Sequence, residues 1–223
     1  MNRWNPTPLL AVLLALATLA GCASFDPGGA PGPAAGAPTY RVGDRWVYRA
    51  QDGFRSPVVW EESHEITAIA PAGITVRVIA RGPTVDVDRT EQWAAPGVVR
   101  SGAVFDLETR RFEPPLLRYR FPLAGGDRWS QRIANPDQPP GPYGPLDRYT
   151  VVGGYESVTT PAGTFDAIRL RVIMRLDDET FWRHATECTY LVWYAPAIGA
   201  AVREIRNADY LEKGSGRFEP AYG

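Results

Sequence analysis

The chain has 223 residues and a formal net charge of −1, a balance that gives no indication of nucleic-acid binding. Its 22 glycines and 21 prolines favour many turns and short connections over long helices. A chain of this length can bury a core without disulfide bonds, and it contains only two cysteines. Composition therefore indicates a globular protein built mainly from strands and turns.

The first residues have the pattern of a signal peptide. Arg3 precedes an apolar run from Leu9 to Ala20 that is too short to span a bilayer, so we expect residues 1–21 to be removed. The run ends in Leu19-Ala20-Gly21-Cys22, which resembles the bacterial lipobox. That resemblance implies acylation of Cys22, by chains such as palmitate, and a mature protein held on a membrane by its lipid.

Residues after the cysteine indicate location and spacing. Position 23 is Ala rather than the Asp that tends to retain similar lipoproteins in the inner membrane, so we expect the periplasmic face of the outer membrane. The segment 22–38 is almost entirely Gly, Ala and Pro, which predicts a flexible tether. A single folded domain is expected over residues 39–211, followed by a frayed tail at 212–223.

Alternating apolar residues and turn signals predict strands through the whole domain. The expected strands are 45–50, 58–70, 74–81, 84–94, 98–105, 116–122, 128–134, 148–159, 165–176, 180–194 and 200–211. The fold class is therefore all-β, a curled antiparallel meander with little helix. Two arrangements stay open, a sandwich and a partly open barrel.

Four landmarks occur twice in the same order. Gly43-Asp44-Arg45-Trp46 returns at 126–129, Pro71-Ala72-Gly73 at 161–163, and Arg77-Val78-Ile79-Ala80-Arg81 at 171–175 in the form Arg-Val-Ile-Met-Arg. Trp93-Ala94-Ala95-Pro96-Gly97 returns loosely at 193–199. We predict two duplicated sheet units, with repeat halves at about 40–105 and 116–211.

Two of these segments also support a family resemblance. Val158 to Ala167, followed by Trp193 to Gly199, resembles a family of exported bacterial β-proteins that is known only as a domain of unknown function. The Phe121-Pro122-Leu123 lead-in to Gly126 is similar as well. The resemblance implies a β-rich protein of the cell envelope, and it supplies no catalytic residues.

Arginines on one face of a predicted strand form the main candidate site. Arg169, Arg171 and Arg175, with Arg77 and Arg81, could make a basic patch for lipid headgroups or an acidic glycan. The alternative, which we favour, is that each arginine pairs with an acid across the sheet. If residues 177–179 form the hairpin loop, Arg169 faces Glu187.

Other candidate groups have simpler interpretations. Cys188 is expected to be a small buried side chain, and His184 lies four strand residues away, about 13 Å, which is too far for a catalytic pair. His64 and His184 alone make a weak metal site, and Asp86 and Asp88 are more typical of a solvated face than of a cation site. No metal or cofactor is expected.

Three functions remain after these exclusions. We favour a non-enzymatic envelope lipoprotein that acts as a binding or assembly module, with an apolar ligand such as a lipid, or an envelope protein, as its candidate partner. The second is an envelope hydrolase that uses acids such as Glu61, Glu62 or Glu65. The third is a purely structural partner of an outer-membrane protein, which an open edge strand would support. The oligomeric state stays open.

Overall fold

The structure is a computed structural model, and it describes residues 28–52, 58–136 and 145–222. All of the regular structure in these residues is β-strand. None of these residues forms a helix long and apolar enough to cross a membrane. The strands are β1 Arg45–Asp52, β2 Val58–Ala70, β3 Gly73–Arg81, β4 Asp86–Ala95, β5 Val98–Gly102, β6 Arg110–Leu117, β7 Arg128–Ile133, β8 Leu146–Thr160, β9 Gly163–Arg175, β10 Glu187–Ala195, β11 Ala200–Leu211 and β12 Phe218–Tyr222.

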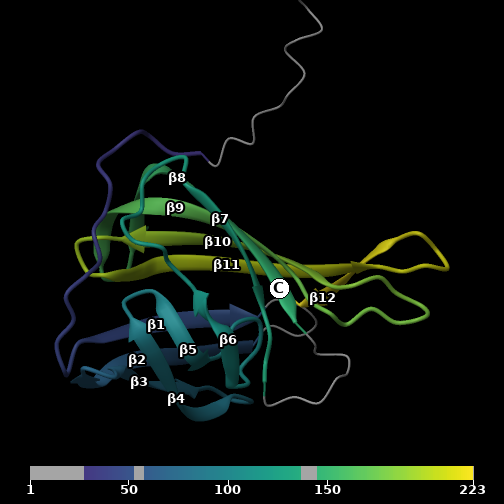
Figure 1. Cartoon of the computed structure of the whole chain (residues 1–223), viewed down its shortest axis with the longest axis horizontal. Coiled ribbons are helices and arrows are strands. Elements are labelled where there is room, and N and C mark those ends of the chain that lie inside the picture. The colour runs from purple at the N-terminus through teal and green to yellow at the C-terminus, as the bar shows by residue number, and fades with distance from the viewer. Residues whose placement is uncertain (1–27, 53–57, 137–144, 223) are drawn as a thin grey trace, which may run out of the picture.

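The twelve strands form two antiparallel sheets of six. Sheet 1 has the order β1-β2-β3-β4-β5-β6 and sheet 2 has the order β12-β11-β10-β9-β8-β7, so each strand pairs with its neighbours in sequence (Figure 1). Short turns make this meander the simplest antiparallel topology. The two sheets are not closed into a barrel, and the all-β prediction is confirmed with a sandwich as its form.

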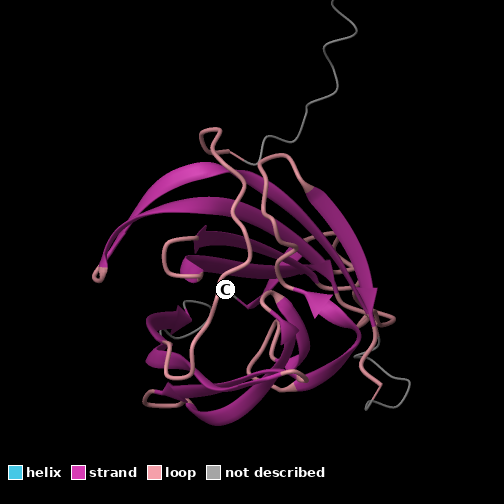
Figure 2. Cartoon of the chain, turned by 60° about the vertical axis from the view of Figure 1, so that its left-hand side comes forward, coloured by secondary structure: helices cyan, strands magenta, loops and turns pink. Residues whose placement is uncertain are grey.

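One side of each sheet is apolar and faces the other sheet. On β3 the inward residues Ile74, Val76 and Val78 are buried, and on β9 Leu170 and Val172 are buried in the same core. Alternation along the strand puts every second side chain inside. Figure 2 shows sheet 2 arching over sheet 1, so the inner faces form the main core. A second, smaller buried cluster of Val158, Ala167, Trp193 and Ala195 lies on the outer side of sheet 2.

The repeated landmarks occupy matching places in the two sheets. Before β1 the amide of Gly43 donates to Ile66 O (2.8 Å), and before β7 the amide of Gly126 donates to Val152 O (2.9 Å). The Pro-Ala turns end at Gly73 and Gly163, which have φ values of 140° and 135°. Only glycine adopts that conformation readily, so the repeated Gly is a turn requirement. These matched turns are what two copies of one unit would have.

The boundaries of the predicted domain need correction at both ends. Residues 28–38 do not behave as a tether, because the amide of Ala30 donates to Tyr155 O (2.8 Å) and that of Ala35 to Leu123 O (2.9 Å). Ala35 is buried in the core. At the other end, the predicted frayed tail contains β12, which pairs with β11 from Ala208 to Leu211. Backbone hydrogen bonds, invisible in a Gly/Ala/Pro composition, order the first segment.

Two strand assignments also differ from the prediction. The strand expected at 116–122 is β6, which lies at 110–117 and contains two prolines near the sheet edge, where a missing amide is tolerated. The strand expected at 180–194 begins only at Glu187, because residues 177–186 form a longer connection. Asp178 holds this connection by accepting hydrogen bonds from the Thr186 amide (2.8 Å) and hydroxyl (2.7 Å).

Candidate binding site between the sheets

The inner face of sheet 1 carries charged residues as well as apolar ones. On β4 the register pairs Arg89 with Val78 and Glu91 with Val76, so both charged side chains point into the core beside buried valines. Glu91 is only 1% exposed. A buried carboxylate is destabilising unless cations and hydrogen-bond donors surround it, so the contacts of Glu91 define this part of the interior.

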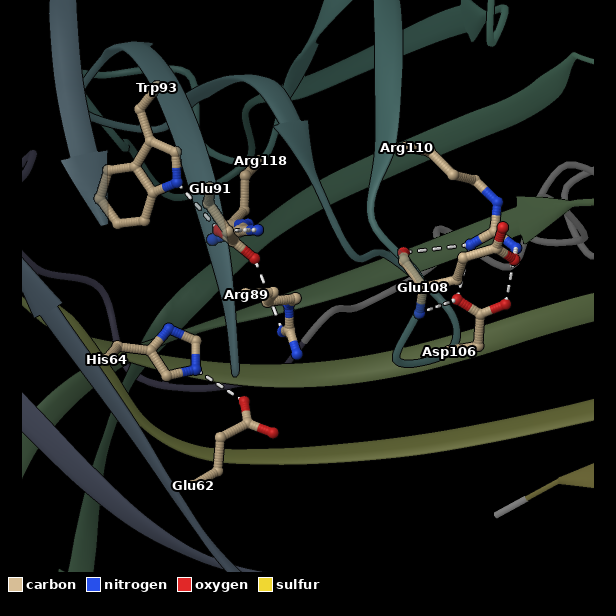
Figure 3. Close-up of polar contacts among 9 residues, drawn as sticks. All are labelled: Glu62, His64, Arg89, Glu91, Trp93, Asp106, Glu108, Arg110 and Arg118. Carbon is tan, nitrogen blue, oxygen red and sulfur yellow. Dashed lines mark hydrogen bonds and ion pairs between the residues drawn. The ribbon is translucent and has the colours of Figure 1, made fainter. Parts of the chain in front are cut away.

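Glu91 is held by three groups (Figure 3). The indole Nε1 of Trp93 donates to it at 2.9 Å, Arg118 Nη2 lies 3.1 Å away, and Arg89 Nη2 lies 3.7 Å away. Burial alone would raise the pKa of Glu91, but the Arg118 charge and the Trp93 hydrogen bond outweigh it, and the pKa is lowered. Gly102 on β5 makes room, since a Cβ there would lie 2.9 Å from Glu91 Cδ.

A second carboxylate lies on β2 in the same face. Glu62 Oε1 lies 2.6 Å from His64 Nε2, and the register places Tyr48 of β1 opposite Glu62. Burial would raise the pKa of Glu62, but the hydrogen bond and charge of His64 outweigh it and lower the pKa to about 2. Glu62 is therefore a carboxylate at every physiological pH.

Sheet 2 contributes a buried cation from β8. Arg148 is 7% exposed and donates to Leu117 O (2.7 Å), to Thr150 Oγ1 (2.8 Å) and to Arg118 O (3.3 Å). Among the described residues no carboxylate forms an ion pair with it. Burial, with the nearby Arg118 charge, lowers the pKa of Arg148 to about 10. Arg148 is still a cation at neutral pH, and neutral oxygens alone solvate it.

The strand β11 brings a further charged pair to this region. Glu204 is opposite Val192 and Arg206 is opposite Tyr190, so both point inward, and Arg206 Nε donates to Glu204 Oε1. Glu204 is near enough to act electrostatically on Arg118 and Arg148. The Arg206 side chain is 46% exposed, compared with 25% for Arg118 and 11% for Arg89. Solvent thus reaches the charges from the β11 side.

We call these residues the inter-sheet cluster. It contains four guanidinium groups and three carboxylates, together with one imidazole and one phenol: Arg89, Arg118, Arg148, Arg206, Glu62, Glu91, Glu204, His64 and Tyr48. The cluster therefore has one positive charge in excess when His64 is neutral. In addition, Nε and Nη1 of Arg89 are buried and have no hydrogen-bond partner. An anion is the group that would complete this arrangement.

One sequence pattern on β4 is a weak signal for this cluster. Asp86 and Asp88 were predicted to lie on a solvated face, and they do lie on the outer face of β4. Every second residue of the same strand, Val87, Arg89, Glu91 and Trp93, lies on the inner face, so two charged side chains share that face with two apolar ones. Charged residues at inward-facing positions are the signal in the sequence. The convergence of β8, β11 and the segment after β6 depends on the packing of two sheets and is absent from any local pattern.

The five predicted arginines do not form a single patch. Arg77 and Arg81 lie on the outer face of sheet 1, whereas Arg169, Arg171 and Arg175 lie on the outer face of sheet 2. In sheet 1, Arg77 Nη2 is 2.6 Å from Asp88 and Arg81 Nη1 is 2.7 Å from Asp86.

Two of the sheet 2 arginines also have acidic partners. Arg169 Nη1 is 3.0 Å from Glu156, and Arg175 Nη2 is 3.5 Å from Glu179. The expected pairing of Arg169 with Glu187 is wrong, because the longer β9–β10 connection shifts the register and places Arg175 opposite Glu187.

The acids proposed for a hydrolase do not converge. Glu61 is opposite Arg49 and Arg81 on the outer face of β2, and Glu65 lies on that same face, whereas Glu62 points inward. Some described carboxylates, Glu62 and Glu91 among them, have a pKa that departs from the ordinary value. In every one of these carboxylates the pKa is lowered. A general acid needs a raised pKa. The described residues also contain no group of three or more His, Cys, Asp or Glu side chains that could hold a metal ion.

The remaining candidates have structural surroundings. Cys188 is fully buried in the core, as expected. His184 lies in the β9–β10 connection rather than on a strand with Cys188, and its Nδ1 is 3.6 Å from Glu179. Cys22 lies outside the described residues, so its lipidation stays a prediction.

A small cavity lies where β7 ends and β8 begins. Its volume is about 20 Å³, and its lining includes Phe105, Phe112, Ile133 and Leu146. That is room for about one water molecule, far less than an acyl chain needs. The cavity therefore gives no support for an apolar ligand at this place.

Comparisons with known proteins find little that is similar to this chain. No family model matches it, and neither does any curated protein. Two solved structures are similar, a candidate lipoprotein of Parabacteroides distasonis and a candidate exported protein of Bacteroides fragilis with a YmcC-like fold. The first is 14% identical with a TM-score of 0.42, covering 85% of this chain and 96% of the other. The second is 12% identical with a TM-score of 0.42, covering 84% and 100%. Similarity at this level carries no functional inference.

Proposed function

We propose that this protein is a lipid-anchored, non-enzymatic envelope protein that binds an anionic group in the inter-sheet cluster. The observation that carries the proposal is the excess of one guanidinium over the carboxylates in a largely buried region. An unbalanced buried charge is destabilising, and a bound carboxylate or phosphate would balance it. The lipobox at residues 19–22 supports the anchor, and Ala23 supports the outer membrane as its location.

Arg89 is the residue best placed to receive the anion. Two of its nitrogens are buried without a partner, and each of these N–H groups can donate to an oxygen of a bound carboxylate or phosphate. Arg148 would add charge from the opposite sheet, and the exposed Arg206 lies on the solvent side where a ligand would enter. The ligand in this proposal therefore carries an anionic group, whereas the apolar ligand considered from the sequence does not need one.

A thermal-shift experiment tests this proposal. The probes are inorganic phosphate and octanoate, which present the two anion chemistries separately. A ligand at one hundred times its Kd stabilises the folded state by about 2.7 kcal/mol, which raises Tm by roughly 5–10 °C for a domain of this size. We expect such a rise for the unmodified protein and its loss in Arg89→Gln.

The matched control is Arg132→Gln. Arg132 is 64% exposed and pairs with Asp147 at the surface, so its removal should leave the rise intact. Absence of any rise with either probe would refute the anion site. An equal rise in Arg89→Gln and Arg132→Gln would show that the anion binds elsewhere.

A role in assembly has its own supporting observation. The strand β12 covers β11 only from Ala208 to Leu211, so among described residues the outer edge of β11 from Ala200 to Asn207 has no ladder partner. Such an edge accepts an added strand. A proline at Ile205 in β11 should abolish crosslinking to a strand-donating partner in cells, and unchanged crosslinking would exclude this role.

The matching turns of the two sheets support a duplicated origin of the fold. The Gly-Asp entries to β1 and β7 and the Pro-Ala-Gly turns before β3 and β9 are equivalent in position. In this proposal the inter-sheet cluster is the feature that differs between the copies, since each sheet contributes different charged residues.

A further inference from the structure

We propose that the outer face of sheet 2 lies against the membrane surface, where Arg203 binds lipid headgroup phosphates. This inference rests on the proposed lipid anchor at Cys22. It commits to one side of the sandwich and to one partner, the headgroup layer of the bilayer that holds the anchor.

The chain leaves the described domain beside the edge of β8, on the outer side of sheet 2. Gly28 lies there because its carbonyl accepts from the Gly154 amide (2.7 Å). It also lies against the side chain of Arg169, since a Cβ at Gly28 would be 2.6 Å from Arg169 Nη1. The anchor therefore approaches the domain on this face.

The chain between the anchor and this point is short. Five residues separate Cys22 from Gly28, and six Cα–Cα steps span at most about 20 Å. The bilayer surface is thus held within about 20 Å of the outer face of sheet 2. The opposite face of the sandwich lies farther away by the thickness of two packed sheets, about 10 Å between their planes.

The side chains on this face suit contact with lipid headgroups. Trp193 lies between two arginines, with Arg169 Cζ 5.8 Å and Arg203 Cζ 5.1 Å from the ring centre. Arg203 is exposed and forms no ion pair among the described residues, while the only acid in this group is Glu156, which already binds Arg169. Half-buried Leu191 and Ile205 complete the surface. Arginines with aromatic and aliphatic neighbours suit the boundary between headgroups and water.

The outer face of sheet 1 has a different character. Its counterpart arginines, Arg77 and Arg81, are each bound by an aspartate of β4, at 2.6 and 2.7 Å. These aspartates already pair with the two arginines, whereas Arg203 on sheet 2 has no acidic partner among the described residues. The two faces therefore predict one orientation on the membrane rather than two.

Site-directed labels on the full lipidated protein test this orientation. The mature protein is reconstituted into vesicles of phosphatidylethanolamine and phosphatidylglycerol, with a nitroxide at Asn207→Cys on sheet 2 or at Thr90→Cys on sheet 1. Both positions are exposed, and the native Cys188 is buried, so each label is specific. We expect the label at 207 to be shielded from an aqueous relaxation agent compared with the label at 90, and the two to be equal in detergent.

Charge variants identify the cause of the shielding. Each arginine near an anionic bilayer changes the partition by about fivefold, so Arg203→Gln should remove most of the contrast between labels. The matched variant Arg77→Gln should retain it. Equal shielding of the two labels while the protein floats with the vesicles would overturn this inference alone. Failure of the protein to float would refute the anchor, and this inference with it.

Discussion

The charge of Glu91 is predicted to be worth several kcal/mol to the fold. The substitution Glu91→Gln keeps an oxygen that accepts from the Trp93 indole, which now lies 2.9 Å away, and removes only the charge. Arg118, at 3.1 Å, and Arg89, at 3.7 Å, then lose their countercharge in a site that is 1% exposed. Breaking a buried ion pair from one side costs about 3–5 kcal/mol, and we expect this loss of unfolding free energy.

Urea denaturation followed by tryptophan fluorescence measures the effect. The control is Asp88→Asn on the outer face of the same strand, where the aspartate is 42% exposed and its partner Arg77 is 52% exposed. An exposed pair contributes about 0–1 kcal/mol, so this control should change stability little. A loss below about 1 kcal/mol for Glu91→Gln, or a loss equal to that of Asp88→Asn, would refute the description of a buried, charge-balanced Glu91.

Three further predictions concern packing, pH and accessibility. Gly102→Ala should destabilise the fold by about 1–3 kcal/mol in urea, because the new methyl group meets Glu91, whereas Gly36→Ala, with no atom within 4 Å, should change stability by less than about 0.5 kcal/mol. Equal effects would contradict the close packing at Gly102. The pKa of Glu62 is about 2, below its ordinary 4.5, so its carboxylate stabilises the fold above pH 4.5 and this contribution falls away as the pH drops toward 2. Acid titration of unfolding should be steeper in the unmodified protein than in Glu62→Gln, and identical curves would contradict the prediction. Cys188 is fully buried, so a thiol reagent should modify it only as fast as the protein opens, and rapid labelling in native buffer would be inconsistent with the core.

Local patterns predicted most of the strands. The limits of β2 at Val58 and Ala70 and of β11 at Ala200 and Leu211 agree with the structure, because turn residues flank clear alternation at both ends. The prediction failed where backbone contacts replace side-chain pattern. The segment at 28–38 has no alternation, yet its amides bond to β8 and to Leu123, and β6 contains prolines that resemble a strand break.

The inter-sheet cluster was beyond the reach of sequence alone. Arg148 and Arg206 occupy strand positions that, without a known inner face, look like ordinary exposed arginines. Only the facing of two sheets brings Arg148 near Arg118 and Arg206 near Glu62, and pairing between sheets leaves no periodic signal along the chain. The predicted arginines of β3 and β9 were easier to find because they alternate regularly, and the structure places them on two separate outer faces.

The most direct test of the anion site is a crystal structure of the protein soaked in bromide. Bromide stands in for the anionic head of the ligand, and its anomalous scattering locates it without ambiguity. We expect a bromide within about 3.5 Å of Nε or Nη1 of Arg89, the two buried nitrogens without a partner. Bromide bound only to surface arginines such as Arg132, with none in the inter-sheet cluster, would contradict it.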